Sequence, residues 1–470
     1  MASTGVYFAG KQRIKPGAYS QVDAQNMVPL SNGEQKVLAV LGVADSGKPQ
    51  EVLWFNDPSN AKAAIHSGDL LDCANVAWAP SANITENPGA DLIAMVRVNK
   101  GTQATTTIGV AVSLTSVGYD LRAYKYGIVV GLGGDFVLTL TDGVTTEVSP
   151  EIAKNNDAVV AWVNSNSKIA TATKTAETVL EATVGLIPFT TLGTSPVATA
   201  EDWETAIDLL AKEQLIDGVI LATVDPLTHA YLKTAVDISS SNRKERRMFV
   251  GHDTGEDVDS VVTRATAFNS SRAVLATPGI KRLKSDGTIA ASAMYTAAAV
   301  AGMWAGGDAK EPLTYKYVGA LGLDKVYSDP DEVEKLISGG VCVVEATKSG
   351  YRIVQSVTTY TSDLNILYRE LSVSTLADLM SKEMRDEMEG KVVGRARTST
   401  DSTSIYNRAI TKLNQFVKRG WLVGDETQGV TPYRNVSLYR VGLGWGIEYE
   451  GSPAEPNNYV LISSHYRSLS

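Results

Sequence analysis

Helices and short apolar strands alternate through the middle of the chain, and this alternation constrains the fold more than any other feature. After Pro196 the helix-like segments are EDWETAIDLLAKEQ, THAYLKTAV and EDVDSVVTRATAF. Each is followed by an apolar run of strand length, namely DGVILATVD, MFVGHDT and RAVLATPG. Three repeats of a helix and an apolar strand predict a parallel sheet covered by helices on both faces.

Two earlier apolar runs are also strand candidates. They are KVLAVLGV from Lys36 and LIAMVRV from Leu92. The segment between them, SNAKAAIHSGDLLDCANVAWA, has a helical composition, with an N-cap candidate at Ser59 after Pro58. We expect this β, α, β unit to join the same sheet.

The composition shifts to Thr and Val from Gly101 to about Thr194. Within this block, GIVVGLGGDFVLTLTDGVTTEV predicts three strands joined by a glycine turn and an Asp-Gly turn. Because the block interrupts the helix and strand alternation, we expect an inserted domain that is rich in strands.

The pattern changes again from Tyr351, where the strand RIVQSVTTY precedes two long amphipathic helices. The first is predicted from about Leu364 to Met388. The second ends at Gly420, a C-terminal stop, and its apolar face carries Ile405, Tyr406, Ala409, Ile410, Leu413, Phe416 and Val417. The predicted strands VSLYRVG and GWGIEYEG follow, and the terminal strand NYVLISSHYR comes after a linker that holds Pro453 and Pro456.

Two further segments have distinctive compositions. Gly287 to Gly307 is uncharged but consists mainly of Ala, Ser, Thr and Gly, which predicts a buried, closely packed helix and no membrane span. At the N-terminus, GVYFAGKQRIKPGAYSQV carries three lysines and arginines among its apolar residues and does not resemble a secretory leader. Its proline and glycines disfavour a helix and predict an extended, basic arm.

The sequence thus predicts a multidomain protein of α/β and α+β class, with a parallel α/β sheet core, an inserted β-rich domain and a C-terminal α+β domain with extended terminal strands. The expected division has an N-terminal arm, an α/β domain in two parts around the insertion, an inner C-terminal domain and a C-terminal strand arm. In chain order, its boundaries are 1–22, 23–100, 101–194 (the insertion), 195–350, 351–455 and 456–470.

Charge and cysteine content exclude some functional classes. The 43 basic and 52 acidic residues give a net charge of −9, which argues against a protein that wraps nucleic acid. Cys73 and Cys342 lie far apart and outside any CxxC motif, so neither a zinc site nor a disulfide framework is expected. This cysteine usage suits a reducing cytoplasm.

One motif raises an enzymatic alternative. GVADSGKP, Gly42 to Pro49, follows a strand and matches the GxxxxGK pattern of a nucleotide-binding P-loop. Pro49 replaces the Ser or Thr whose hydroxyl would bind magnesium, which favours a simple turn with a solvated lysine. The alternative is a P-loop-like or flavodoxin-like α/β nucleotide-binding enzyme. In such an enzyme Asp225, which ends the apolar run GVILATVD, could be the acidic partner of the P-loop.

Other catalytic signals are weak. The four histidines have no second ligand at metal-binding spacing: His66, His229, His252 and His465. The glycine runs GLGGD and GLGWG precede no predicted helix and indicate turns. The basic cluster NRKERR, Asn242 to Arg247, could bind phosphate but is more typical of an exposed loop. We therefore expect no catalytic, cofactor-binding or metal-binding residues, and no enzyme.

Four features in order resemble the contractile tail sheath proteins of bacteriophages and related contractile injection systems. They are the PGAY arm, the small-residue segment from Ala290 to Leu323, VTTY (Val357 to Tyr360) before a long helix with Arg369, and a terminal strand after a linker. The variant looks similar to sheaths of the Mu-like group. The helix after VTTY lacks the family's usual double-arginine pattern, so no residue contacts are carried over there.

The resemblance implies a virion tail protein, assembled in the host cytoplasm, that forms stacked hexameric rings around a tail tube. The rings shorten to drive the tube through the host envelope, with no cofactor consumed. Its implied partners are other copies of the chain, the tail tube protein, and baseplate and tail terminator proteins, with no nucleic acid and no direct membrane insertion. Strand exchange between subunits would use arm residues Val6, Phe8, Ile14, Pro16, Gly17, Tyr19, Tyr459, Val460, Leu461, Ile462 and Tyr466.

Overall fold

The structure is a computed structural model that describes residues 6–8, 11–13, 36–83, 85–178, 180–393, 401–441 and 444–458. Its centre is a nine-stranded sheet with the order β18-β21-β20-β15-β14-β13-β3-β5-β4. The parallel strands are β3 (Val37–Gly42), β5 (Ile93–Arg97), β13 (Ile216–Leu221), β14 (Arg247–Val250), β15 (Ala273–Thr277) and β20 (Val341–Thr347). Antiparallel strands close the two edges: β4 (Val52–Phe55), β21 (Gly350–Ile353) and β18 (Tyr317–Val318). The predicted parallel core is confirmed.

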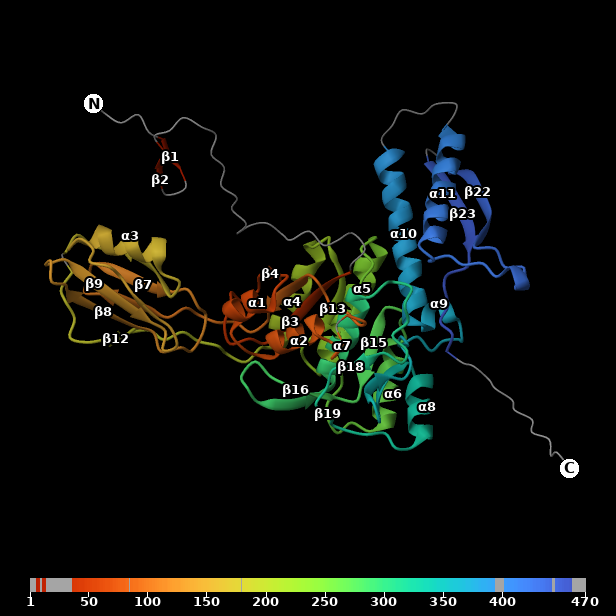
Figure 1. Cartoon of the computed structure of the whole chain (residues 1–470), viewed down its shortest axis with the longest axis horizontal. Helices are drawn as coiled ribbons and strands as arrows, with labels where there is room; N and C mark the ends of the chain where they lie inside the picture. Colours follow the sequence, from red (N-terminus) through yellow and green to blue (C-terminus); the bar gives the residue numbers. More distant parts are fainter. Residues whose placement is uncertain are drawn as a thin grey trace.

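Helices cover both faces of this sheet, as Figure 1 shows. One face packs under α1 (Pro58–Ile65), α2 (Asp69–Trp78) and α7 (Ala293–Gly306). The other packs under α4 (Ala200–Leu209) with the short 3-10 turn Leu210–Lys212, α5 (Pro226–Ser241), α6 (Val258–Phe268) and α8 (Pro330–Ser338). The N-cap predicted at Ser59 is wrong, because the side chain of Asp57 caps α1 by accepting from the amide of Ser59.

Helix α7 confirms the predicted buried, small-residue helix. All its residues from Ala293 to Ala305 are buried. A β-carbon on Gly302 would lie 2.3 Å from the carbonyl oxygen of Ala77 in α2, so the two helices approach as closely as their backbones allow. The helix starts later than Gly287, because that residue turns the chain between β16 (Ile280–Leu283) and β17 (Ile289–Ser292), which form a small sheet with β19 (Gly322–Leu323).

The insertion forms two antiparallel sheets around its own hydrophobic core, seen at the left of Figure 1. One sheet has the order β11-β7-β6 and the other β10-β9-β8-β12. The elements are β6 (Thr105–Ile108), β7 (Val112–Ser116), β8 (Lys125–Val130), β9 (Phe136–Thr141), β10 (Thr146–Val148), α3 (Asn156–Asn166), β11 (Ala170–Lys174) and β12 (Ile187–Pro188). The glycine and Asp-Gly turns lie where predicted, between β8, β9 and β10.

The C-terminal region has a further core, formed by α10 (Leu371–Lys391), α11 (Asp401–Lys418) and the strands β22 (Tyr433–Val441) and β23 (Gly444–Gly451). The single helix predicted from Leu364 is wrong. A short helix, α9 (Ile366–Arg369), is followed by Glu370, whose extended backbone, with a ψ of 127°, separates α9 from α10. Gly420, with φ of +69°, ends α11 as predicted.

Near the N-terminus, β1 (Val6–Phe8) pairs antiparallel with β2 (Lys11–Arg13). A 3-10 turn, Glu426–Gln428, precedes β22. None of the helices in the described ranges combines the length and apolarity needed to cross a membrane.

Candidate functional site

The GVADSGKP loop does not have the geometry of a phosphate site. A P-loop presents free backbone amides to the phosphates and leads into a helix. Here the amide of Ala44 donates to Asn99 Oδ1 at 2.9 Å, and the amides of Asp45 and Ser46 donate to backbone carbonyls at the end of α1 and just after it. The strand β4, and no helix, follows Pro49. Three successive amides of this loop are therefore already engaged within the protein.

The neighbouring acidic and basic groups are also engaged. Lys48 is exposed and pairs with Glu51 at 2.6 Å. Asp225 caps α5, with its carboxylate accepting from the amide and hydroxyl of Thr228. The simple turn that the sequence favoured at this loop is therefore the interpretation that the contacts support.

The histidines in the described ranges, His66, His229 and His252, are not gathered into a reactive centre. His229 lies buried with Nε2 2.9 Å from the carbonyl oxygen of Thr223, and burial lowers its pKa to about 4. Burial also lowers the pKa of His252, whose Nε2 lies 2.7 Å from Thr277 Oγ1. His66 lies 3.5 Å from Asp120 of the insertion. Across the described ranges, no group of three His, Cys, Asp or Glu side chains could hold a metal ion.

A buried arginine joins the insertion to the central sheet. Arg97, at the end of β5, is fully buried, and its guanidinium donates to the carbonyl oxygens of Gly47 at 2.9 Å and Tyr119 at 2.6 Å. It also donates to Ser195 Oγ at 3.0 Å. One side chain therefore contacts the sheet, the insertion and the segment that returns from the insertion.

An extended set of polar contacts lies between α10 and the central sheet. The expectation that NRKERR is an exposed loop is wrong for its last two residues, since Arg246 and Arg247 are each only 3% exposed. Arg247 donates to Asp378 of α10 at 2.8 Å and to Ser374 Oγ at 3.0 Å. Burial lowers the pKa of Arg247 to about 10, so the side chain is still charged at neutral pH.

This contact continues along one stripe of α10. Arg272 also pairs with Asp378, and Lys382, Arg385 and Glu389 pair in turn with Asp217, Glu245 and Arg243. The α10 residues are spaced by four, three and four positions, which places them on one face of the helix. We call Asp378, Lys382, Arg385 and Glu389, with their partners, the α10 seat.

The α10 seat is buried at one end and exposed at the other. Asp378 is 19% exposed, whereas Glu389 at the far end is 56% exposed. Near the buried end, Trp304 of α7 donates to Thr375 Oγ1 at 2.9 Å. Figure 1 shows α10 standing beside the sheet with α11, β22 and β23 next to its far half. The seat thus joins α10, and with it the C-terminal core, to the α/β body.

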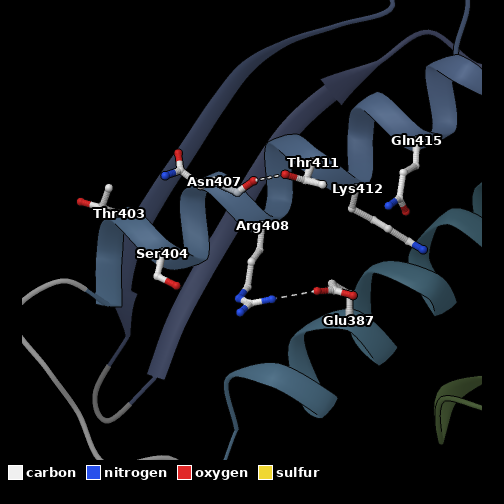
Figure 2. A pocket seen from close by; sticks show the side chains of 8 residues that line it. All are labelled: Glu387, Thr403, Ser404, Asn407, Arg408, Thr411, Lys412 and Gln415. Carbon is white, nitrogen blue, oxygen red and sulfur yellow. Dashed lines mark hydrogen bonds and ion pairs between the residues drawn. The ribbon is translucent and has the colours of Figure 1, made fainter.

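A polar hollow of about 560 Å³ lies between α10 and α11. Figure 2 shows Arg408 pointing toward Glu387, to which it donates at 3.2 Å. Lys412 pairs with Glu383 at 2.6 Å. The remaining lining is uncharged and polar: Thr403, Ser404, Asn407, Thr411 and Gln415. The hollow has the character of a hydrated surface and not of a catalytic centre.

Strands β22 and β23 form an isolated two-stranded sheet. In the described part of the chain they pair only with each other, antiparallel from Tyr433 and Gly451 to Val441 and Gly444. One face packs on α11 through residues such as Val436 and Ile447. Two-stranded sheets are marginal in water and expose a row of unpaired backbone groups at each edge. This sheet is therefore suited to accept further strands.

The predicted arm residues fall largely outside the described residues. Val6 and Phe8 lie in β1, which pairs with β2. The others lie outside the described ranges: Ile14, Pro16, Gly17, Tyr19, Tyr459, Val460, Leu461, Ile462 and Tyr466. Their assignment as intersubunit contacts stays a prediction, as do the domain boundaries and the likeness to the Mu-like group.

Comparison with known proteins identifies relatives over nearly the whole chain. Residues 197–359 match the family model of the phage tail sheath protein central domain. The tail sheath protein of Bacillus phage SP01 is 29% identical, with 98% of this chain and 97% of that protein covered. The putative tail sheath protein of Enterococcus phage phiEF24C is 23% identical over 85% of this chain and 89% of that protein.

Solved structures share the fold. The crystal structure of a sheath tail protein from Desulfitobacterium hafniense matches with a TM-score of 0.68 and 14% identity, covering 94% of this chain and 97% of that one. The helical sheath of the anti-feeding prophage in its contracted state matches with a TM-score of 0.53 and 10% identity, covering 96% and 99%. The shared fold therefore extends well beyond the central domain.

Proposed function

We infer that this chain is a structural subunit of a contractile tail sheath, since its predicted resemblance to the phage tail sheath proteins is confirmed. The observation that carries this inference is the match to the SP01 tail sheath protein over nearly the full length of both chains. A match of that extent includes the C-terminal elements and not only the central α/β domain.

We propose that the subunits polymerise by strand exchange. The basic N-terminal segment and the segment after Asn458 are each too short to bury a core of their own, so ordering them requires an external template. Within the described ranges β22 and β23 form a sheet of two strands, and the sheet can be extended by such strands at its edges. Adding a strand satisfies backbone groups on both partners and links subunits without fixing the orientation of their bodies.

During contraction the folded domains of the subunits would change position, while the exchanged strands keep neighbouring subunits connected. Stacked hexameric rings would shorten around a tail tube and drive it through the host envelope, with the energy stored in subunit contacts. A bias of about 5.5 kcal/mol moves a two-state unit from 1:99 to 99:1, so a few kcal/mol per linked subunit makes contraction effectively irreversible. The α10 seat would transmit this motion, because it holds the strand-accepting sheet to the α/β body.

The proposed partners are other copies of this chain, the tail tube, the baseplate and the tail terminator, in a virion tail assembled in the host cytoplasm. We propose no enzymatic turnover, because three successive amides of the P-loop-like segment are engaged by Asn99 and by backbone carbonyls, and a strand follows the segment in place of a helix. Energy stored in subunit contacts requires no cofactor.

Negative-stain electron microscopy of the purified chain at high concentration tests this function. We expect ordered tubes with a regular axial repeat. The nucleotide-binding alternative predicts monomers or small oligomers whose melting temperature rises with magnesium and ATP. That rise, together with an absence of tubes, would contradict the proposed function.

A further inference from the structure

A groove at the base of α10 contains the last described residue of the chain. The groove measures about 910 Å³ and is lined by one side of α8, by the segment around α9 and by Asn458. It lies at the opposite end of α10 from the exposed end of the α10 seat, since Glu370 immediately precedes α10. The C-terminal segment therefore starts inside a preformed surface depression.

The groove is lined by apolar side chains that remain partly exposed to solvent. Leu364 is 85% exposed and Ile366 is 37% exposed. Val333 and Ile337, one turn apart on α8, are only partly buried against the sheet. Large exposed apolar groups gathered in one depression favour an apolar occupant, because burying them removes unfavourable contact with water.

Asn458 is held in the groove by a polar contact. Its side chain hydrogen-bonds to Glu370, whose carboxylate is 2% exposed and also accepts from Ser356 Oγ at 2.7 Å. Four residues earlier, the amide of Ala454 donates to the carbonyl oxygen of Trp421 near the end of α11. The chain thus passes from the β22 and β23 region to the base of α10 before residue 459. Figure 1 shows this descent beside α10 to the level of α9.

The chain's own next residues fit this surface best. Asn458 is followed by Tyr459, Val460, Leu461 and Ile462, a run of four apolar residues. His465 and Arg467 come after them in the sequence, and the lining of the groove includes carboxylates such as Glu334. Because the segment is covalently attached at the groove, its effective concentration there is on the order of millimolar, which exceeds that of any separate copy in dilute solution.

We propose that, before assembly, residues 459–466 lie in this groove of their own subunit and leave it when the arm is donated to a neighbour. This storage site rests on the proposed strand exchange. It keeps an apolar strand covered in the free subunit, where an exposed strand would pair with any available edge. Release of the arm then becomes a step that precedes polymer growth.

Disulfide trapping tests the storage site in the full-length chain at low micromolar concentration. One cysteine replaces Ile337 in the groove, and the other replaces either Leu461 or Ile462, which point to opposite sides of an extended strand. Native Cys73 and Cys342 are fully buried, so they do not compete. The control places the groove cysteine instead at Leu227, which is 80% exposed at the start of α5 and outside the groove.

We expect an intramolecular disulfide in monomers for one of the two Ile337 pairs and none for the Leu227 control, read by peptide mass spectrometry. Equal trapping in the control, or no trapping in either pair, would overturn the proposal. Trapping only between two chains would also overturn it, because the groove would then take a neighbour's arm. If trapping fails while truncation of the arm still abolishes tubes, the storage site is wrong and strand exchange stands.

Hydrogen exchange gives a second readout that does not depend on disulfide geometry. In monomers the amides of residues 459–466 should exchange more slowly than in Leu364→Asp, a change at a largely exposed position that places a carboxylate in the groove. Leu321→Asp, at a 63% exposed position outside the groove, is the matched control and should retain the protection. Unprotected arm amides in the parent chain, or equal exchange in all three proteins, would contradict the storage site.

Discussion

Arg247 at the start of β14 donates to Asp378 of α10 at 2.8 Å, and its guanidinium is almost completely buried by that contact. The pair joins the central sheet to the helix that carries the C-terminal elements. Arg272 supplies a second ion pair to the same carboxylate. Asp378 is therefore the residue on which the attachment of α10 depends most.

Asp378→Ala should strongly destabilise the protein, because it leaves the Arg247 charge buried without a partner. Removal of one member of a buried ion pair costs about 3 to 5 kcal/mol. Urea unfolding measures the loss. Arg243→Ala removes the exposed pair at the other end of the seat, with side chains 70% and 56% exposed, and should cost less than about 1 kcal/mol. Similar losses of unfolding free energy for the two variants would contradict the expected difference between the buried and the exposed end of the α10 seat.

Gly302→Ala should disrupt the packing of α7 on α2. The added β-carbon would lie 2.3 Å from the carbonyl oxygen of Ala77, so the helices must separate. We expect a loss of at least roughly 1 to 3 kcal/mol, as for overpacked cores, and a similar loss for Ala298→Leu. Gly390→Ala is the control, because nothing lies within 4 Å of a β-carbon there, and it should be neutral or stabilising. Thermal unfolding that ranks the variants otherwise would contradict this packing.

His229 should make the protein less stable in mild acid. Its native pKa is about 4 and its reference pKa 6.5, so between these values only the unfolded chain binds the proton. Stability from this group is complete above about pH 6.5 and falls by about 3 kcal/mol as the pH drops to 4. His229→Gln should flatten this part of the pH profile in urea unfolding. If the free energy of unfolding of the variant fell with pH as steeply as that of the parent, His229 would not be the cause of the acid destabilisation.

Deletion of the insertion should leave assembly intact. The insertion has its own core, and the amide of Thr102 donates to the carbonyl oxygen of Thr194, so a short Gly-Ser bridge can join the cut ends. The central sheet loses mainly the contact of Arg97 with Tyr119. We expect tubes in electron microscopy. A folded deletion variant that forms no tubes would show that the insertion holds the polymer together.

The central sheet could be predicted from the sequence because its signals are local. Each buried parallel strand is an apolar run a few residues long, and an amphipathic helix separates it from the next. The burial of α7 was also predictable, since a helix rich in alanine and glycine is suited to close packing. The edge strand β4 was not predicted, although its sequence VLWF has the apolar and aromatic composition of a strand.

The α10 seat could not be predicted because its contacts join distant segments. Arg247 lies 131 residues from Asp378, and NRKERR alone has the composition of an exposed loop. The break at Glu370 had no local signal either, since its carboxylate is fixed by Ser356 from the preceding strand region. Side chains that function through long-range ion pairs become recognisable only once the fold has placed them together.

Removal of residues 457–470 tests strand exchange most directly. The truncated chain lacks the terminal strand but retains every element from β3 to β23, so circular dichroism should show near-normal helix content. A second truncation that removes residues 1–20 tests the other arm in the same way. We predict folded monomers and no tubes from either truncated chain under conditions in which the full chain forms tubes. Tubes from both truncated chains, as abundant as those of the full chain, would contradict strand exchange as the link between subunits.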